Sequence, residues 1–270
     1  MTDETTIVPL LEPREGIPPV IDDAAGLARV VRAFAEGAGP VAVDAERASG
    51  YRYSGRAYLV QLRREGAGSA LIDPIRCPDL SELDAALAGA EVVLHAASQD
   101  LPCLAELGFH PRELFDTELA GRLLGYERVG LGMMVENVLG FRLEKGHSAA
   151  DWSTRPLPED WLRYAALDVE VLVELRNALH KELADSGKLE WAREEFAWVL
   201  ASKSPVPAPT PGGEPPASTR SARRAGWPWS GSCGRSATAS PARPTWPRAG
   251  CCPTPRSSPP PWSCPAPPRP

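Results

Sequence analysis

The 270-residue sequence has no apolar run long enough to span a bilayer, and its acidic, proline-containing N-terminus lacks the pattern of a signal peptide. We therefore expect a cytoplasmic protein with no membrane partner, and no feature indicates a protein partner. Cysteine is scarce before residue 204, where Cys77 and Cys103 stand singly. The four later cysteines lack the C-x-x-C and histidine spacing of a zinc site, so neither a disulfide nor a zinc scaffold is expected.

Leucine and isoleucine are absent from residues 204–270, which hold one valine, one acidic residue and 19 of the 30 prolines. Such a segment cannot bury enough apolar surface to offset the entropy of ordering it. We predict a disordered Pro/Arg/Ser-rich tail. Its richness in Ala, Arg, Gly, Pro, Trp and Cys is also typical of a G+C-rich gene translated out of phase. A genuine disordered tail and a frameshift product both stay open.

Basic residues are outnumbered in residues 1–203, which carry 21 Lys and Arg against 34 Asp and Glu. This balance does not indicate nucleic-acid binding through bulk electrostatics. An anionic substrate would need local basic groups or metal ions.

Short β-rich runs alternate with helical patterns between residues 18 and 203, which is typical of an α/β domain. Strands are expected at 40–46, 57–63, 70–73 and 91–95, the first three as antiparallel neighbours. Helices are expected at 79–88 (capped by Ser81), 98–107, 116–124, 131–139, 158–183 and 188–200.

Two acids close the first of these strands, in the stretch VAVDAER. Asp44 and Glu46 point to the same face, because side chains alternate along a strand. Like charges at the end of an apolar strand repel each other and lose solvation, a cost that a metal ion would offset. The alternative is a strand end at which both acids face water or pair with Arg47.

Further acids stand where they could join this pair. Asp100 follows the strand at 91–95 near the start of a helix, and Asp168 interrupts the buried stripe of the helix at 158–183. Tyr164 lies four residues before Asp168, on the same helix face. Read singly, Asp100 could serve only the helix dipole, and Asp168 could be a surface acid beside a packing tyrosine.

Together these patterns carry a resemblance. D-x-E at Asp44 and Glu46, H-A-x-x-x-D from His95 to Asp100, and Y-A-A-x-D-V from Tyr164 resemble the three motifs of the DEDDy exonucleases, and the likeness is closest to the ribonuclease D family. The segments at 61–62, 71–74, 115–120 and 150–158 match in the same order.

The resemblance implies an RNase H-like mixed β-sheet flanked by helices, and a 3'-5' exoribonuclease that uses two divalent ions, Mg²⁺ or Mn²⁺, and releases nucleoside 5'-monophosphates. In this scheme Asp44 bridges both ions, Glu46 and Asp168 complete the site of the ion that activates water, and Asp100 serves the other ion. Tyr164 orients the attacking water. RNA 3' ends, notably of tRNA precursors, are the implied substrate.

Weaker candidates for nucleic-acid contact are His95, Lys145, Trp152 and Arg155, although a structural role is favoured for His95 and Trp152. The domain scheme is a flexible N-terminus (1–17), an exonuclease domain (18–203) and the tail (204–270), which could be the frameshifted remnant of a C-terminal HRDC-like domain. The chain departs from the family at Arg47, where an aromatic residue is frequent, and in lacking that helical C-terminal domain. A Werner-type DNA 3'-5' exonuclease and a non-catalytic nucleic-acid-binding module stay open as alternatives.

Overall fold

The computed structural model describes residues 7–143, 146–147 and 149–202. The tail at 204–270 and Lys145 lie outside the described residues, so the expectations placed on them stay predictions. No helix in the described part of the chain combines the length and apolar character needed to cross a membrane.

A six-stranded mixed sheet organises the described residues, in the order β2-β5-β4-β3-β6-β7. Its strands are β2 (Val20–Ile21), β3 (Ala38–Arg47), β4 (Ala57–Glu65), β5 (Gly68–Ile72), β6 (Val92–Leu94) and β7 (Leu114–Asp116). As expected, β3, β4 and β5 are antiparallel neighbours, while β6 and β7 extend the sheet parallel to β3. The sheet thereby places the end of β3, with Asp44 and Glu46, near its middle.

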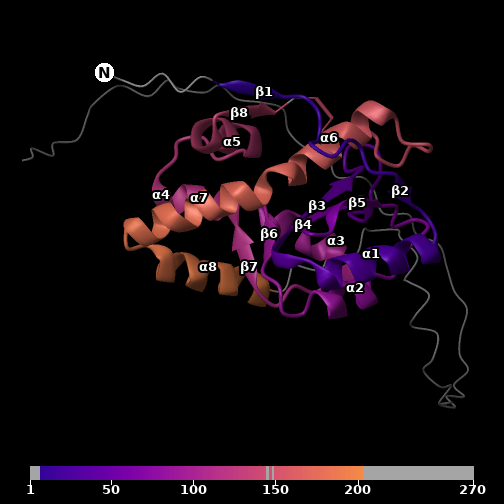
Figure 1. Ribbon diagram of the computed structural model, residues 1–270, viewed down its shortest axis with the longest axis horizontal. Helices are drawn as coiled ribbons and strands as arrows, with labels where there is room; N and C mark the ends of the chain where they lie inside the picture. Colours follow the sequence, from indigo (N-terminus) through magenta and orange to yellow (C-terminus); the bar gives the residue numbers. More distant parts are fainter. Residues whose placement is uncertain (1–6, 144–145, 148, 203–270) are drawn as a thin grey trace, which may run out of the picture. The chain divides into compact units, whose positions relative to one another are not determined.

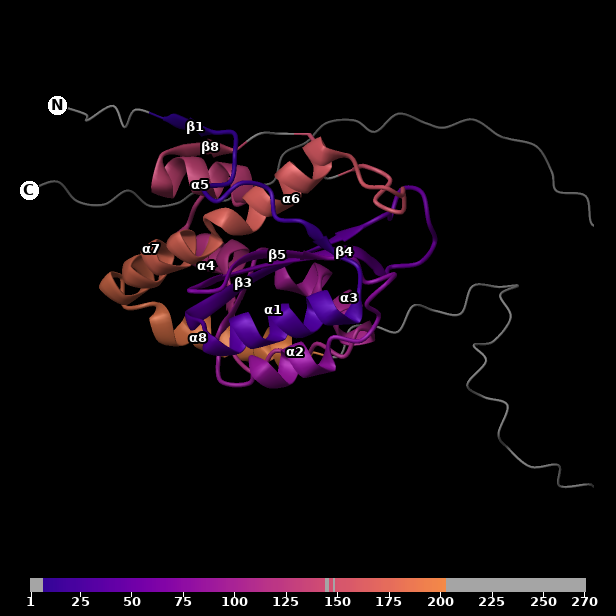
Figure 2. The ribbon, with the colours of Figure 1, turned by 45° about the vertical axis from the view of Figure 1, so that its right-hand side comes forward.

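Helices cover both faces of this sheet (Figures 1 and 2). They are α1 (Ala24–Glu36), α2 (Ser81–Ala86), α3 (Leu101–Glu106), α4 (Thr117–Leu124), α5 (Leu131–Leu139), α6 (Glu159–Glu170), α7 (Leu172–Asp185) and α8 (Leu189–Ala201). α1 and α2 pack together on one face, and α6 and α7 cross the other, where α6 contacts β3, β4 and β5. This mixed sheet with helices on both faces confirms the expected fold class.

Two buried clusters hold the layers together. The larger fills the space between the sheet and its helices. The smaller lies under α6, where Trp152 packs with Leu59, Leu71, Ala165 and Ala166. This second cluster fastens α6, and hence Asp168, to the sheet.

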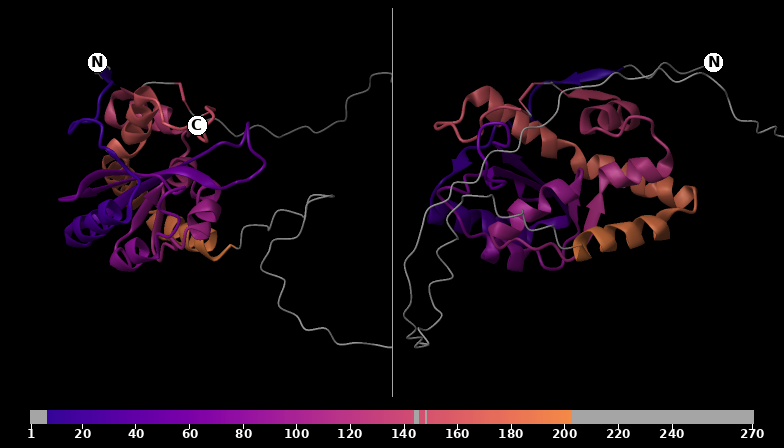
Figure 3. Two further views of the ribbon diagram at one scale, coloured as in Figure 1. Left: turned by 90° about the vertical axis from the view of Figure 1, so that its right-hand side faces the viewer. Right: turned by 180° about the vertical axis from the view of Figure 1, so that it is seen from behind.

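A separate parallel pair, β1 (Val8–Leu10) and β8 (Phe141–Leu143), lies beside α5 (Figure 3). Residues 7–17 thus include a strand paired with β8, and the flexibility expected of the N-terminus (1–17) stays a prediction. The charged residues at 12–15 make the ion pairs described below, which composition alone does not reveal.

The expected helix at 158–183 is wrong in one respect, because two helices occupy that range. α6 ends at Glu170, and Val171 leaves the helical conformation at φ −112° and ψ 5°. Three β-branched residues, Val169, Val171 and Val173, weaken helix formation here. Val171 is fully buried, so packing rather than the apolar stripe sets the break.

Other boundaries also moved. Ser81 is not the cap of α2: Leu80 is the N-cap residue, and the Ser81 N–H donates to Asp79 Oδ1 at 2.9 Å. The sequence reasoning missed α1, whose N-cap Asp23 accepts a hydrogen bond from the Gly26 N–H at 2.6 Å. The expected helix at 131–139 has the observed bounds, ending at Gly140 with φ +72°.

Candidate metal centre

Three carboxylates meet at the end of β3. Asp44 and Glu46 come from β3 and Asp168 from α6, and one carboxylate oxygen of each lies within 4.8 Å of the others. β3 supplies two acids on one face because its side chains alternate, and α6 crosses that face with Asp168 in its last turn. Asp168 thus adds a third like charge to the pair at the end of β3. A bound cation, as predicted from the sequence, is the simplest explanation of how three carboxylates can lie so close together.

Asp100 approaches from the turn between the 3-10 helix Ala97–Gln99 and α3, and it is only 3% exposed. It lines a cavity of about 270 Å³ together with the other three carboxylates. Arg47 is its cationic partner, with Nη1 3.1 Å from Asp100 Oδ1. The Arg47 guanidinium also donates to the Gln99 carbonyl, so it bridges the end of β3 to the turn that carries Asp100.

Gln61 lies in a segment that matches the family by sequence, but only the structure reveals its contact with Asp44. The fully buried Gln61 on β4 faces Asp44 across the strand pair, and its Nε2 donates to Asp44 Oδ2 at 2.7 Å. Its Oε1 has no hydrogen-bond partner. Pairing of β3 with β4 thus fixes the orientation of the Asp44 carboxylate.

Burial and mutual repulsion disfavour ionisation of this cluster. The pKa of Glu46 is raised well above its usual value, first by burial and then by the charges of Asp44 and Asp168. Burial and the Asp44 charge likewise raise the pKa of Asp168 well above its usual value. The same two causes raise the pKa of Asp100 to about 8, although Arg47 opposes the shift. A divalent cation would reverse the balance, because it favours the charged form of every carboxylate it touches.

Tyr164 lies in the same cavity, one helical turn before Asp168, as the i, i+4 spacing predicted. Burial and the neighbouring charges of Asp168 and Glu46 raise the pKa of its phenol above the usual value. The phenol therefore stays protonated at neutral pH. In this state it can donate one hydrogen bond and orient a small polar molecule beside the carboxylates.

His95 also lines the cavity and shares a 2.9 Å hydrogen bond between Nδ1 and the Thr117 hydroxyl. Burial lowers the pKa of its imidazole to about 4, so the ring is neutral at pH 7. This bond agrees with the structural role favoured by the sequence.

Trp152 and Arg155 serve the fold in this structure. The Trp152 ring is fully buried, so it cannot stack on a base, and its Nε1 donates to the His147 carbonyl at 3.2 Å. Arg155 donates from Nε and Nη2 to the two Asp73 carboxylate oxygens, each at 2.8 Å. Two segments that matched the family by sequence, 71–74 and 150–158, are thereby joined to each other.

The chain is similar to known proteins in sequence. A family model described as a 3'-5' exonuclease matches residues 18–184. Ribonuclease D of Escherichia coli (strain K12) is 36% identical over 193 residues, covering 70% of this chain and 50% of that protein. Ribonuclease D of Haemophilus influenzae is 34% identical over 186 residues, covering 67% of this chain and 46% of that protein. The chain thus spans about half the length of these curated relatives.

The chain is also similar to solved structures. A protein from Bifidobacterium adolescentis is 48% identical with a TM-score of 0.72, covering 73% of this chain and 49% of that one. E. coli RNase D, described as an exoribonuclease involved in structured RNA processing, is 31% identical with a TM-score of 0.63, covering 70% of this chain and 51% of that one.

Proposed function

The chain belongs to the 3'-5' exonuclease family, and on this premise we propose that it removes nucleotides from RNA 3' ends with the help of two divalent cations. The single observation that carries the proposal is the carboxylate cluster, in which oxygens of Asp44, Glu46 and Asp168 lie within 4.8 Å of one another. Oxygen-rich clusters of this kind suit hard cations such as Mg²⁺ or Mn²⁺.

The residues present fit two such ions. Asp44 would touch both, Glu46 and Asp168 would complete the ligands of one, and Asp100 would serve the other. Bound cations would supply the positive charge that stabilises the attacking and leaving oxygens of a phosphodiester. Burial and mutual repulsion raise the pKa values of Glu46, Asp100 and Asp168, and bound cations would favour the charged forms of these acids.

The chain's own side chains would do the positioning. The protonated Tyr164 phenol would orient the attacking water beside Asp168. Gln61 would hold the Asp44 carboxylate through its 2.7 Å hydrogen bond. A second cavity of about 240 Å³ shares Glu46 and Arg47 with the first and offers room for part of the substrate next to the carboxylates.

RNA is preferred as the substrate because the E. coli relative is described as acting in structured RNA processing. Processing of tRNA 3' ends and a cytoplasmic location are part of this proposal. A DNA 3'-5' exonuclease is the second candidate, since the matching family is described as a 3'-5' exonuclease without restriction to RNA. A non-catalytic module is disfavoured, because binding alone gives no reason to bring together four acids whose charged forms are disfavoured by loss of solvation.

The test is cation-dependent degradation of a 5'-labelled single-stranded RNA, with a DNA of the same sequence in parallel. Wild type should give a ladder that shortens from the 3' end, and EDTA or Asp44→Asn should abolish it. Asp185→Asn, which removes an exposed acid on α7, is the matched control and should leave the ladder intact. Intact RNA with folded wild-type protein would refute the proposal, and faster loss of the DNA would favour the second candidate.

A further inference from the structure

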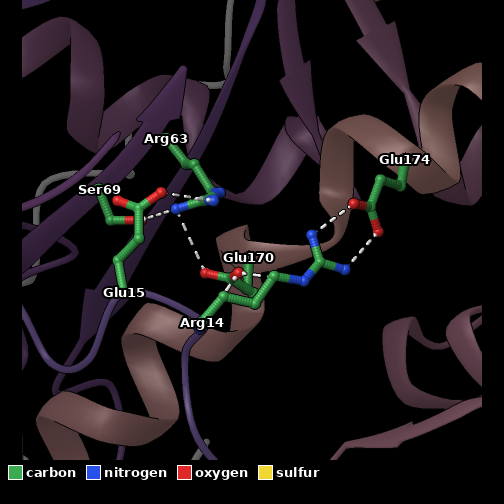
Figure 4. Close-up of polar contacts among 6 residues, drawn as sticks. All are labelled: Arg14, Glu15, Arg63, Ser69, Glu170 and Glu174. Atoms are coloured by element: carbon green, nitrogen blue, oxygen red, sulfur yellow. Dashed lines mark hydrogen bonds and ion pairs between the residues drawn. The ribbon is translucent and has the colours of Figure 1, made fainter. Parts of the chain in front are cut away.

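A second group of charged side chains, Arg14, Glu15, Arg63, Glu170 and Glu174, gathers around the end of α6 (Figure 4). Its centre is Glu170, the last residue of α6, whose side chain has no exposed surface. Arg63 on β4 places Nη1 3.4 Å from Glu170 Oε2. Arg14, from the segment after β1, places Nε 3.7 Å from Glu170 Oε1, and its backbone N–H donates to the same oxygen at 3.4 Å.

Each arginine is itself held from a second side. Arg14 donates to both Glu174 oxygens, at 2.5 and 3.0 Å, as the paired dashed lines of Figure 4 show. Arg63 donates to the Ser69 hydroxyl at 2.8 Å and to Glu15 Oε1 at 3.3 Å. A fully buried carboxylate is costly unless it is paired, and two clamped arginines supply that pairing for Glu170.

The ion pairs and hydrogen bonds among Arg14, Arg63 and Glu170 are called the Glu170 network below. Both this network and the carboxylate cluster include residues of β4 or its partner strand β3 and of α6. On β4, Gln61 contacts Asp44, and Arg63, two residues later on the same strand face, contacts Glu170. On α6, Asp168 belongs to the cluster and Glu170 to the network. Glu170 is the last residue of α6, so the ion pairs of its side chain act on the helix turn that also carries Asp168.

The segment 12–15 adds a further contact between the N-terminal part of the chain and α6. Glu12 Oε1 lies 3.0 Å from Nε of Arg163 on α6, in addition to the contacts of Arg14 and Glu15. These residues precede the region 18–184 that matches the exonuclease family. The residues that hold Glu170 thus come partly from the segment before the family match, and Glu170 itself lies outside the three family motifs.

We propose that Glu170 is a positioning residue: with Arg63 and Arg14 it fixes the last turn of α6 and thereby places the Asp168 carboxylate for cation binding. The inference rests on the proposed function, because it assigns Asp168 to a cation. It predicts that breaking the network weakens cation binding even though no member of the network belongs to the carboxylate cluster.

The experiment measures Mn²⁺ binding by calorimetry on the full chain without RNA, together with kcat and KM on RNA. Glu170→Gln keeps the shape of the side chain and removes the charge that Arg63 and Arg14 offset. Removing a partner that orients a metal ligand typically weakens metal binding about 10- to 100-fold, and we expect a loss of about 10-fold here. Because the loss concerns the site rather than substrate contact, kcat should fall at subsaturating Mn²⁺ while KM for RNA stays within about twofold.

Arg176→Gln is the matched control. Arg176 on α7 donates to both oxygens of Glu91 at 2.6 and 3.1 Å, so its loss also breaks a bidentate ion pair, here between a helix and the residue that precedes β6. It should lower the melting temperature but leave Mn²⁺ affinity unchanged. Arg14→Gln, which removes a side chain that is 43% exposed, leaves Glu170 paired with Arg63 and covers the case in which Glu170→Gln does not fold. It should weaken Mn²⁺ binding a few-fold.

The outcomes are distinguishable. Equal Mn²⁺ affinity in wild type and folded Glu170→Gln would overturn the positioning role alone, as would an equal loss in Arg176→Gln. If Glu170→Gln does not fold, unchanged affinity in Arg14→Gln would overturn it. Folded wild type that binds no Mn²⁺ would overturn the proposed function, and this inference with it.

Discussion

Gln61 orients the Asp44 carboxylate, and this arrangement costs stability. Its amide donates to Asp44 Oδ2 at 2.7 Å, while its buried Oε1 has no hydrogen-bond partner. A buried acceptor without a partner is destabilising, so the side chain is not optimised for the stability of the metal-free protein. What the side chain contributes is the orientation of the Asp44 carboxylate.

We predict that Gln61→Leu lowers exonuclease activity about tenfold, as expected when a partner of a metal ligand is removed, while the melting temperature changes little. The change in stability is small because removal of the unsatisfied Gln61 Oε1 offsets part of the cost of leaving Asp44 Oδ2 without its donor. Activity assays and thermal melting would check this. A large drop in melting temperature with unchanged activity per folded molecule would show that Gln61 acts only in the core.

The carboxylates also predict how stability depends on pH. The pKa of Asp100 is raised from 3.8 to about 8 in the folded protein, and the pKa values of Glu46 and Asp168 are raised as well. At pH values between the unfolded and the folded pKa of these acids, the folded state binds more protons than the unfolded state. The free energy of unfolding therefore falls as pH rises.

We therefore expect the melting temperature of the metal-free protein, in EDTA, to fall as pH is raised from about 5 to about 8. Saturating Mg²⁺ should reduce this fall, because the cation binds the deprotonated acids. Asp100→Asn, which cannot ionise, should show a shallower fall in EDTA. A melting temperature that rises with pH in EDTA would contradict the assignment.

At the scale of elements, α6 takes its place from contacts at both of its ends. Its last turn is held by the Glu170 network, and the segment before its first turn is held by Arg155 and by the buried Trp152. Asp168 reaches β3 because both ends are fixed. The break at Val171 then lets α7 follow a separate path across β3 and β6.

For the segment before α6 we predict that Arg155→Gln acts mainly on stability. It removes charge-assisted hydrogen bonds to Asp73, whose carboxylate is 6% exposed, and leaves that carboxylate without its cation. Hydrogen bonds to charged groups contribute about 1.5 to 3 kcal/mol, and we expect a loss in this range, seen in chemical denaturation. An unchanged free energy of unfolding, with a raised KM for RNA, would instead support direct nucleic-acid contact by Arg155.

At the scale of the whole chain, the described residues contain a sheet with a core on each face, and both buried clusters are built from residues before 203. Residues 204–270 lack leucine and isoleucine. We predict that a protein ending at Ser202 keeps the cation-dependent degradation of short single-stranded RNA within about threefold of the full chain, since the composition of the tail offers little apolar surface to bury. A larger loss, with the melting temperature retained, would show that the tail contributes to substrate binding.

The sequence alone determined much of the fold and the chemistry of the candidate site. Alternation of apolar runs indicated the sheet, and the helix at 131–139 was predicted with its observed bounds because an apolar stripe and a following glycine mark it locally. The three motifs singled out Asp44, Glu46, Asp100, Tyr164 and Asp168, which the structure brings into one cavity. Spacing along a strand or helix is a local property, so it can be read without knowing the fold.

Only the tertiary structure decided what lies opposite these residues. The contacts of Gln61 with Asp44, Arg47 with Asp100, and Arg155 with Asp73 join positions far apart in sequence, and no periodicity encodes them. The break at Val171 and the burial of Glu170 likewise depend on the neighbours that pack against each residue. Local propensity fixes which elements form and which face carries the acids, whereas the energy of a buried charge is set by its surroundings in three dimensions.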